Sequence, residues 1–265
     1  MSSHGFRRGV LRPEAAADFL QVRTHPPAPE LAALVDFYWN PRWDLRGREP
    51  YDQKVLAHPN VHLVFEPAGP LVYGVQREVY VRRLAGRGQV LGVKFRPGAL
   101  RAFSAGPAAA LADRAVPAAS VFGAGAEATG RRILALDGLA EMAALADRFL
   151  LGRLPDGPPD PRIAEVTALV ERITASPQLF RVDALARELD VPVRRLQRLF
   201  ADYVGASPKW VLRRARLHEA AARADAGTGL DWAALAADLG YADQAHLTRD
   251  FAAAVGTTPG RYARA

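Results

Sequence analysis

The 265-residue sequence contains no cysteine. This absence excludes disulfide bonds, zinc sites built on thiolates and cysteine nucleophiles. The sequence also lacks any run of 18 apolar residues, and residues 1–11 hold only short apolar pieces around Arg7 and Arg8. Because a secretory leader or a membrane span needs a longer apolar run, we expect neither secretion nor membrane association. A cytoplasmic protein is the corresponding expectation.

The remaining composition is that of a globular protein with a basic surplus. Hydrophobic residues make up 49% of the chain and charged residues 24%, which is enough to form a core. Lys and Arg number 35 against 28 Asp and Glu, so the formal net charge is +7. This surplus suits a polyanionic partner. Since both halves of the chain share it, the net charge does not locate a binding face.

The last third of the chain, residues 180–265, contains an internal repeat. The segment Leu196-Gln-Arg-Leu-Phe200 matches Leu247-Thr-Arg-Asp-Phe251 after a shift of 51 positions. Further pairs at the same shift are Val204 and Val255, Gly205 and Gly256, Pro208 and Pro259, and Arg213 and Arg264. Upstream the shift is 50, because Leu185-Ala186 matches Leu235-Ala236. The second copy therefore has one extra residue in its turn.

Each copy predicts a helix, a tight turn and a second helix. In the first copy Val182, Leu185 and Leu189 share one helical face, and Pro192 fits the first turn of the next helix. That next helix places Arg194 and Arg198 opposite its apolar face. Such a pair of helices can place the second one in the major groove of double-stranded DNA. The alternative is an ordinary solvated face, and two copies in register argue against it.

Polar residues on the outer faces of these second helices are the candidates for contacting base edges. Arg can bond guanine, Gln can bond adenine, and Thr can bond a base or contact the thymine methyl group. The candidates are Arg194, Arg195, Gln197, Arg198, Gln244, His246, Thr248 and Arg249. All eight side chains are expected on the DNA side of the two motifs.

A long helix is predicted between the motifs, over residues 209–226, after a Ser207 cap. At about 1.5 Å per residue it spans on the order of 28 Å, near the roughly 34 Å between successive major-groove faces. One chain could then read two adjacent groove segments. Lys209, Arg213 and Arg214 on this helix either contact phosphates or lie in water.

Residues 180–265 resemble the paired helix-turn-helix domain of the AraC/XylS transcription regulators. The resemblance rests on the two Leu-x-Arg-x-Phe segments and on the closing run from Leu239-Gly240-Tyr241 to Tyr262-Ala-Arg264. It implies a DNA-binding regulator with RNA polymerase as a partner and without a cofactor. The family often has an aromatic residue at the position of Leu247 and a basic one at that of Ala252. The second motif is therefore expected to hold the DNA backbone more weakly.

The N-terminal half predicts an α+β arrangement. A short helix is expected over residues 30–38, because Leu31, Leu34, Val35 and Tyr38 lie on one helical face. Strands are expected over 61–65, 71–75, 79–84 and 90–95, and a helix over 133–151. We therefore expect a small β-barrel or a curved antiparallel sheet with helices, followed by an all-α domain.

This half loosely resembles the N-terminal sensor domains of the same regulators, some of which are cupin-like barrels. The segments that carry the resemblance are Pro59 with the strand Val61-His-Leu-Val-Phe65, Tyr73-Gly74, and Gly92-Val-Lys-Phe-Arg-Pro-Gly98. A barrel or curved sheet could enclose a small-molecule effector. The candidates for binding it are Trp39, Trp43, Phe65 and Tyr73, although aromatic clusters more often form a core.

Neither a metal site nor a catalytic site is expected. His58 and His62 could share a metal only across the Pro59-Asn60 turn, and no third ligand stands nearby at a suitable spacing. The sequence has no Gly-x-Ser-x-Gly segment and no nucleotide-binding loop. The chain is therefore not expected to be an enzyme. A DNA-repair alkyl transferase with such a DNA-binding domain would need an acceptor cysteine.

A proline-rich stretch marks the expected domain boundary, because Pro155, Pro158, Pro159 and Pro161 exclude regular structure. We expect a sensor and dimerisation domain at 1–151, a linker at 152–161 and a DNA-binding domain at 162–265. The predicted function is a sequence-specific transcription regulator controlled by a small molecule, either monomeric or homodimeric. The alternatives are an enzyme-like domain fused to a DNA-binding domain and a ligand-independent architectural DNA binder.

Overall fold

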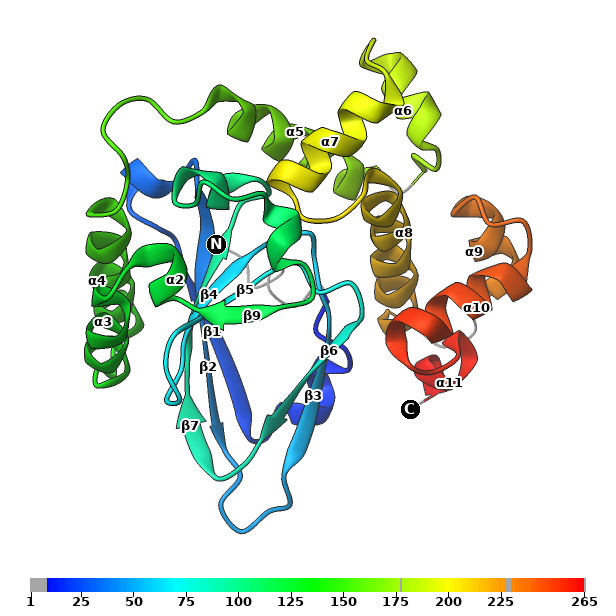
Figure 1. Ribbon diagram of the computed structural model, residues 1–265. Coiled ribbons are helices and arrows are strands. Elements are labelled where there is room, and N and C mark those ends of the chain that lie inside the picture. The colour runs from blue at the N-terminus through cyan, green and yellow to red at the C-terminus, as the bar shows by residue number, and fades with distance from the viewer. Residues whose placement is uncertain (1–8, 177, 227–229, 265) are drawn as a thin grey trace.

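The computed structural model describes residues 9–176, 178–226 and 230–264. An N-terminal part built on β-sheets is followed by a helical part (Figure 1). All described strand pairs are antiparallel, and the sheets do not close into a barrel. The predicted fold class is therefore confirmed in its open-sheet form.

The described strands form one seven-stranded and one two-stranded sheet. The larger sheet has the order β1-β2-β8-β4-β5-β9, with β7 paired to β2. Its strands are β1 (Leu20–His25), β2 (Val35–Asp44), β4 (His62–Phe65), β5 (Leu71–Tyr73), β7 (Arg87–Gln89), β8 (Leu91–Phe95) and β9 (Ala115–Pro117). The smaller sheet pairs β3 (Tyr51–Leu56) with β6 (Val79–Leu84). Successive side chains of a strand point to opposite faces of the sheet. One face of the larger sheet packs in the hydrophobic core, and the other lines a cavity described below.

The four strands predicted in the N-terminal half are confirmed as β4, β5, β6 and β8. The helix predicted over residues 30–38 is wrong. Only a 3-10 turn forms at Pro29–Leu31, and β2 begins at Val35. β-branched and aromatic residues favour strands, and the alternation of Phe37 and Trp39 with buried Tyr38 has a period of two. The spacing of the apolar residues fits both a helix and a strand. Pairing with β1 and β8 makes this segment a strand.

Helices α3 (Gly125–Leu134) and α4 (Leu139–Leu151) pack on one face of the larger sheet. The other helical elements of the N-terminal part are short: the 3-10 turns η1 (Pro13–Ala16), η2 (Pro29–Leu31), η3 (Ala99–Ala102) and η4 (Ala108–Leu111) and the helix α2 (Ala119–Phe122). The single helix predicted over residues 133–151 is two helices. The Asp137-Gly138 pair interrupts it, because glycine is a poor helix former and both residues favour turns.

The helical part begins at residue 161. Its helices are α5 (Pro161–Ala175), α6 (Val182–Glu188), α7 (Val193–Tyr203), α8 (Pro208–Asp225), α9 (Trp232–Asp238), α10 (Gln244–Val255) and α11 (Pro259–Arg264). The predicted long helix is confirmed as α8, and the Ser207 hydroxyl caps it by accepting a hydrogen bond from the Trp210 backbone N–H at 3.2 Å. The two helix-turn-helix motifs are thus α6–α7 and α9–α10, with α8 between them.

The sequence repeat is also a structural repeat. Leu196 and Leu247 are at most 1% exposed, and so are Phe200 and Phe251. The two turns correspond as well. The Val191 backbone N–H donates to the Ala186 carbonyl at 3.0 Å, and the Tyr241 N–H donates to that of Ala236 at 2.9 Å. Equivalent positions therefore have equivalent roles in both motifs.

The turns differ at one left-handed position, which is Asp190 (φ 50°) in the first motif and Gly240 (φ 68°) in the second. Glycine adopts this conformation without the steric cost that a Cβ brings. Replacing Asp190 with glycine is expected to stabilise the protein by about 0.5–1 kcal/mol. The reciprocal Gly240→Asp change is expected to destabilise it more, because a Cβ there would lie 2.4 Å from the Phe180 ring.

Urea unfolding of the two variants beside the parent protein measures both effects. Equal and opposite shifts would show that the backbone conformation acts alone. A larger effect at Gly240 would show the added contact with Phe180.

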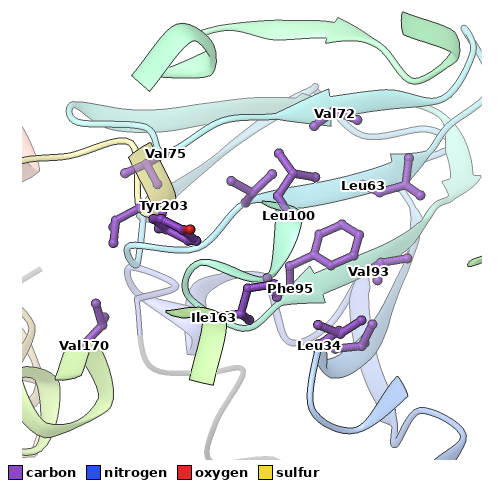
Figure 2. Close-up of a cluster of buried hydrophobic side chains, with 14 of the residues drawn as sticks. Leu34, Leu63, Val72, Val75, Val93, Phe95, Leu100, Ile163, Val170 and Tyr203 are labelled. Carbon is purple, nitrogen blue, oxygen red and sulfur yellow. The ribbon is translucent and has the colours of Figure 1, made fainter. Parts of the chain in front are cut away.

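One hydrophobic core joins the larger sheet to the first motif. Figure 2 shows Phe95 and Val93 of the sheet in the same cluster as Ile163 and Val170 of α5 and Tyr203 of α7. The turn after α7 also lies against the N-terminal part. A Cβ on Gly205 (φ 87°) would come within 2.9 Å of the Ala108 carbonyl oxygen. The first motif is therefore packed directly on the N-terminal part.

Candidate nucleic-acid interface and ligand cavity

The outer face of α7 carries the predicted base-contacting residues of the first motif. Arg194, Gln197 and Arg198 are exposed, on the side opposite the buried Leu196 and Phe200. None of the three forms an ion pair with another described residue. The placement predicted from the helical period is confirmed, and their base-reading role stays a prediction.

Arg195 lies on a different side of the same helix. It is exposed, and it borders a groove between α5 and α7 together with Glu165 and Arg172. Arg172 in turn forms an ion pair with Glu188 of α6. Arg195 therefore faces the flank of the motif, whereas Arg194 and Arg198 face outward.

The outer face of α10 has fewer polar groups. Gln244 and Arg249 are exposed, whereas His246 and Thr248 are half-buried. The His246 ring packs edge-on against Tyr241, with ring centroids 5.1 Å apart. The four candidates of the second motif are thus less uniformly exposed than those of the first.

The structure corrects the assignment of Arg214 as a phosphate-contacting residue. Arg214 is 3% exposed, and its Nη2 donates a hydrogen bond to the Arg77 carbonyl oxygen at 2.5 Å. Its guanidinium lies over the Trp210 ring, 4.6 Å from the centroid. Burial, together with the neighbouring charge of Arg213, lowers the pKa of Arg214 to about 10. The side chain is thus committed to a contact between α8 and the N-terminal part.

The other two phosphate candidates on α8 differ in their surroundings. Lys209 is exposed in the first turn of the helix. Arg213 is half-buried, and its Nε lies 2.9 Å from the Asp250 carboxylate of α10. Lys209 is therefore free to reach a partner, and Arg213 ties the second motif to α8.

A cavity of about 200 Å³ lies between the two sheets. The larger sheet contributes Phe37, Trp39 and Trp43 from alternate positions of β2. The smaller sheet contributes Gln53 of β3 and Tyr80 of β6, among other residues. Both sheets thus supply one face each to a partly open and largely apolar space.

Three of the four predicted effector-binding residues line this cavity, namely Trp39, Trp43 and Tyr73. Phe65 does not. It is fully buried on the opposite face of the sheet, where its ring packs against Phe149 of α4 with centroids 5.9 Å apart. Alternate side chains of β4 point to opposite faces of the sheet, which explains the position of Phe65. His62 and Val64 line the cavity, whereas Leu63 and Phe65 point to the core.

The charged side chains around the cavity are paired. The Lys94 ammonium lies 3.0 Å from the Asp36 carboxylate, and the Arg82 guanidinium lies 2.5 Å from that of Glu66. His62 carries no charge at neutral pH, because burial, and then the charges of Lys94 and His58, lower its pKa to about 3. The fixed charges of the lining are thus compensated.

The wall of the cavity contacts α8. His58 lines the cavity, and its ring stacks on that of His218 in α8, with centroids 3.9 Å apart and an interplanar angle of 6°. Arg214 and Trp210 of α8 both donate to the Arg77 carbonyl, next to the cavity residue Gln76. Sequence analysis missed this interface. Of its two histidines, only His58 was considered from the sequence, together with His62, as a possible metal ligand.

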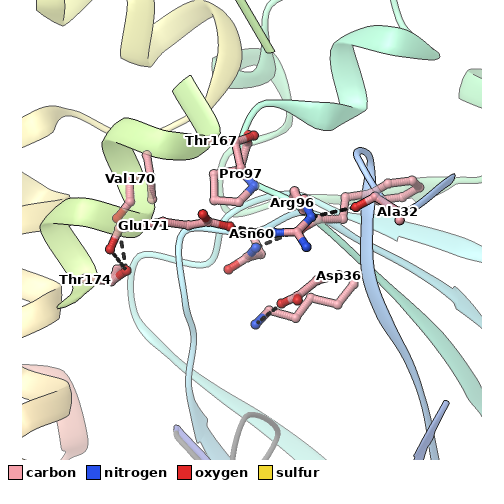
Figure 3. Close-up of polar contacts among 11 residues, drawn as sticks. Ala32, Asp36, Asn60, Arg96, Pro97, Thr167, Val170, Glu171 and Thr174 are labelled. Carbon is pink, nitrogen blue, oxygen red and sulfur yellow. Dashed lines mark hydrogen bonds and ion pairs between the residues drawn. The ribbon is translucent and has the colours of Figure 1, made fainter. Parts of the chain in front are cut away.

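A second interface joins the sheet to α5. The Thr167 hydroxyl donates to the Pro97 carbonyl at 2.7 Å, and Arg96 is paired with Glu171 at 2.6 Å. Figure 3 shows these residues between the sheet and α5. Arg96 also donates to the Ala32 carbonyl at 2.8 Å. These contacts fix α5 against the loop after β8.

Within the described part of the chain, no group of three or more His, Asp or Glu side chains is arranged to hold a metal ion. Over the same residues, no helix combines the length and the apolar character that a membrane span requires.

Comparison with known proteins identifies the helical part. Residues 185–265 match the family described as a helix-turn-helix domain. The chain carries an AraC-type helix-turn-helix domain. This domain supports the interpretation of the chain as a DNA-binding regulator of transcription. The matched segment contains α7 to α11 and the second half of α6, so the resemblance seen in the sequence is confirmed.

The N-terminal part matches a family described only as a domain of unknown function (DUF6597), over residues 23–117. This segment includes every strand that lines the cavity except the start of β1. No curated protein matches the chain.

Several solved structures are similar to the chain. The C-terminal domain of AraT, a response regulator from Geobacillus stearothermophilus, is 26% identical, with 36% of this chain and 84% of that chain covered and a TM-score of 0.33. ToxT from Vibrio cholerae is 11% identical, with 93% and 98% covered and a TM-score of 0.39. ToxT with a bound unsaturated fatty acid is 9% identical, with 92% of each chain covered and a TM-score of 0.36.

Proposed function

We propose that this regulator reads DNA through α7 and α10 and that a small molecule in the cavity between the sheets controls this binding. The observation that carries the proposal is the stack of His58 on His218. It joins a residue of the cavity wall to the helix that connects the two DNA-binding motifs. A ligand that moves the wall therefore moves the element that sets the spacing of the motifs.

The exposed side chains of α7 and α10 are the ones assigned to base contacts. Arg194, Gln197 and Arg198 read bases in one groove segment, and Gln244 and Arg249 read the next, with Arg195, His246 and Thr248 at the flanks. α8 has 18 residues, so at about 1.5 Å each it spans roughly 27 Å, near one turn of DNA. Lys209 contacts a phosphate.

The chain is proposed to act in two parts, 1–151 and 162–265, joined by the segment 152–161. That segment lies outside regular structure up to Asp160. The Asp160 carboxylate accepts a hydrogen bond from the Tyr203 hydroxyl, so the segment is anchored to α7. A homodimer through the N-terminal part would place two copies on DNA and raise the affinity by effective concentration. Light scattering of the full chain measures this directly.

The proposed control is tested by filling the cavity. Val64 is buried and lines it, so Val64→Phe places a larger side chain in the space a ligand would occupy. This variant is expected to change the affinity for a DNA site selected from a random pool by about fivefold or more, as coupling energies between sites commonly do. Fluorescence anisotropy with labelled DNA gives the affinity.

His218→Ala provides the second arm of this test. In that background Val64→Phe is expected to change DNA affinity by less than about half of its original free-energy effect, since the stack that transmits it is gone. His25→Ala, away from the cavity, is the matched control and should leave the coupling intact. A folded Val64→Phe protein with unchanged DNA affinity would refute effector control.

A further inference from the structure

The size of the cavity limits what it can hold. An engineered cavity of about 150 Å³ with apolar walls binds benzene. At about 200 Å³, the cavity between the sheets has room for a molecule of one or two fused rings. A ligand held wholly within this space is therefore smaller than most drug-sized compounds.

The walls favour a flat aromatic molecule. Phe37, Trp39 and Trp43 lie on the cavity face of β2, with Pro41 between the two tryptophans. Tyr73 of β5 and Tyr80 of the smaller sheet also line the space, and their rings meet edge-on with centroids 5.8 Å apart. Aromatic rings attract one another in stacked and edge-to-face arrangements beyond what buried area alone contributes.

The electrostatics exclude a net charge on the ligand. Lys94 and Arg82 are the lining residues with a permanent charge among those described, and each is paired with a carboxylate. An anionic ligand would therefore be a third charge next to an already compensated pair. Burying an uncompensated charge is costly, because the surrounding groups replace its hydration poorly.

Two buried polar atoms of lining residues, Gln53 Oε1 and His62 Nδ1, have no hydrogen-bond partner among the described residues. Gln53 donates its amide N–H groups to the Leu11 and Lys54 carbonyls, at 3.2 and 3.0 Å. The amide oxygen can only accept, so a ligand N–H or O–H is the group that satisfies it.

We propose that the cavity binds an uncharged aromatic molecule of one or two fused rings that carries at least one N–H or O–H donor. This inference rests on the proposed function, in which this cavity holds the effector. It assigns the ligand by the size, walls, charge and open acceptor of the site.

Calorimetric titration of the full-length protein at neutral pH tests the ligand class with four probes. Indole supplies the bicyclic ring and a donor, and indene is the same size without the donor. Indole-3-carboxamide and indole-3-carboxylate are matched in size and differ in charge. We expect indole and the carboxamide to bind, indene to bind about three- to tenfold more weakly than indole, and the carboxylate at least about tenfold more weakly than the carboxamide.

Two cavity variants locate the binding. Val64→Phe and the milder Ala57→Leu both fill the space and should each weaken indole binding at least about tenfold. Arg132→Ala, on the exposed side of α3, is the control and should bind as the parent does. Binding that both folded cavity variants retain would place the ligand elsewhere and overturn the proposal.

The remaining outcomes separate this inference from effector control. Failure of all four probes to bind, or a carboxylate that binds as tightly as the carboxamide, overturns the ligand class. If Val64→Phe still alters DNA affinity in that case, effector control stands. If indole binds in the cavity but neither it nor Val64→Phe changes DNA affinity, the ligand class stands and effector control fails.

Discussion

Replacing Arg198 with alanine is expected to weaken binding to the selected DNA site by about 1–3 kcal/mol, because a guanidinium can bond a guanine edge with two hydrogen bonds. Arg198 is exposed on α7 opposite Phe200, and it forms no ion pair with another described residue. Its side chain is therefore available to the groove. Anisotropy titrations on the selected site and on single-base variants measure both affinity and base preference.

Two further substitutions are compared with Arg198→Ala. Arg132→Ala removes an exposed arginine of α3, far along the chain from either motif, and should change affinity little. Arg249→Ala probes the second motif, whose outer face has alanine at positions 245 and 253. An equal loss on selected and on random DNA would show that Arg198 holds the backbone and reads no base.

Truncating Phe251 to alanine is expected to destabilise the second motif by about 3–5 kcal/mol, the usual cost of removing a buried aromatic ring. The ring is fully buried and contacts Trp232 and Tyr262 edge-on, with centroids 6.4 and 5.5 Å away. Its cluster joins α8–α11 to Leu11 and Leu56 and is separate from the core of the larger sheet. The second motif should therefore open before the rest of the chain.

Hydrogen exchange distinguishes this local effect from global unfolding. In Phe251→Ala, amides of α9 and α10 should exchange faster while those of β8 and α4 keep their protection. Phe200→Ala is the matched variant from the first motif. Since Phe200 belongs to the core shared with the sheet, protection should fall in both parts. The same exchange pattern in both variants would contradict two separate clusters.

Local sequence pattern was enough to predict the repeat, the buried positions of the motifs and several strands. The repeat at shifts of 50 and 51, the buried positions Leu196, Phe200, Leu247 and Phe251, and the exposed faces of α7 and α10 all follow from the helical period. Four strands of the N-terminal part, β4, β5, β6 and β8, followed from their residue types and turns. Apart from the repeat, each of these signals lies within about a dozen neighbouring residues, so no long-range contact is needed to read it.

Contacts between distant segments decided the rest. Arg214 looked like its neighbours Lys209 and Arg213, and only the approach of the Arg77 carbonyl buried it. Phe65 lies in the core and does not line the cavity, because the register of β4 directs alternate side chains to opposite faces of the sheet.

The contact of the cavity wall with α8 depends most on tertiary structure. His58 and His218 are 160 positions apart, and their stack exists because one hydrophobic cluster packs Leu56 of β3 against α8. Composition and local period specify which residues a helix or strand buries. They do not specify which other element buries them, since that depends on the packing of whole surfaces.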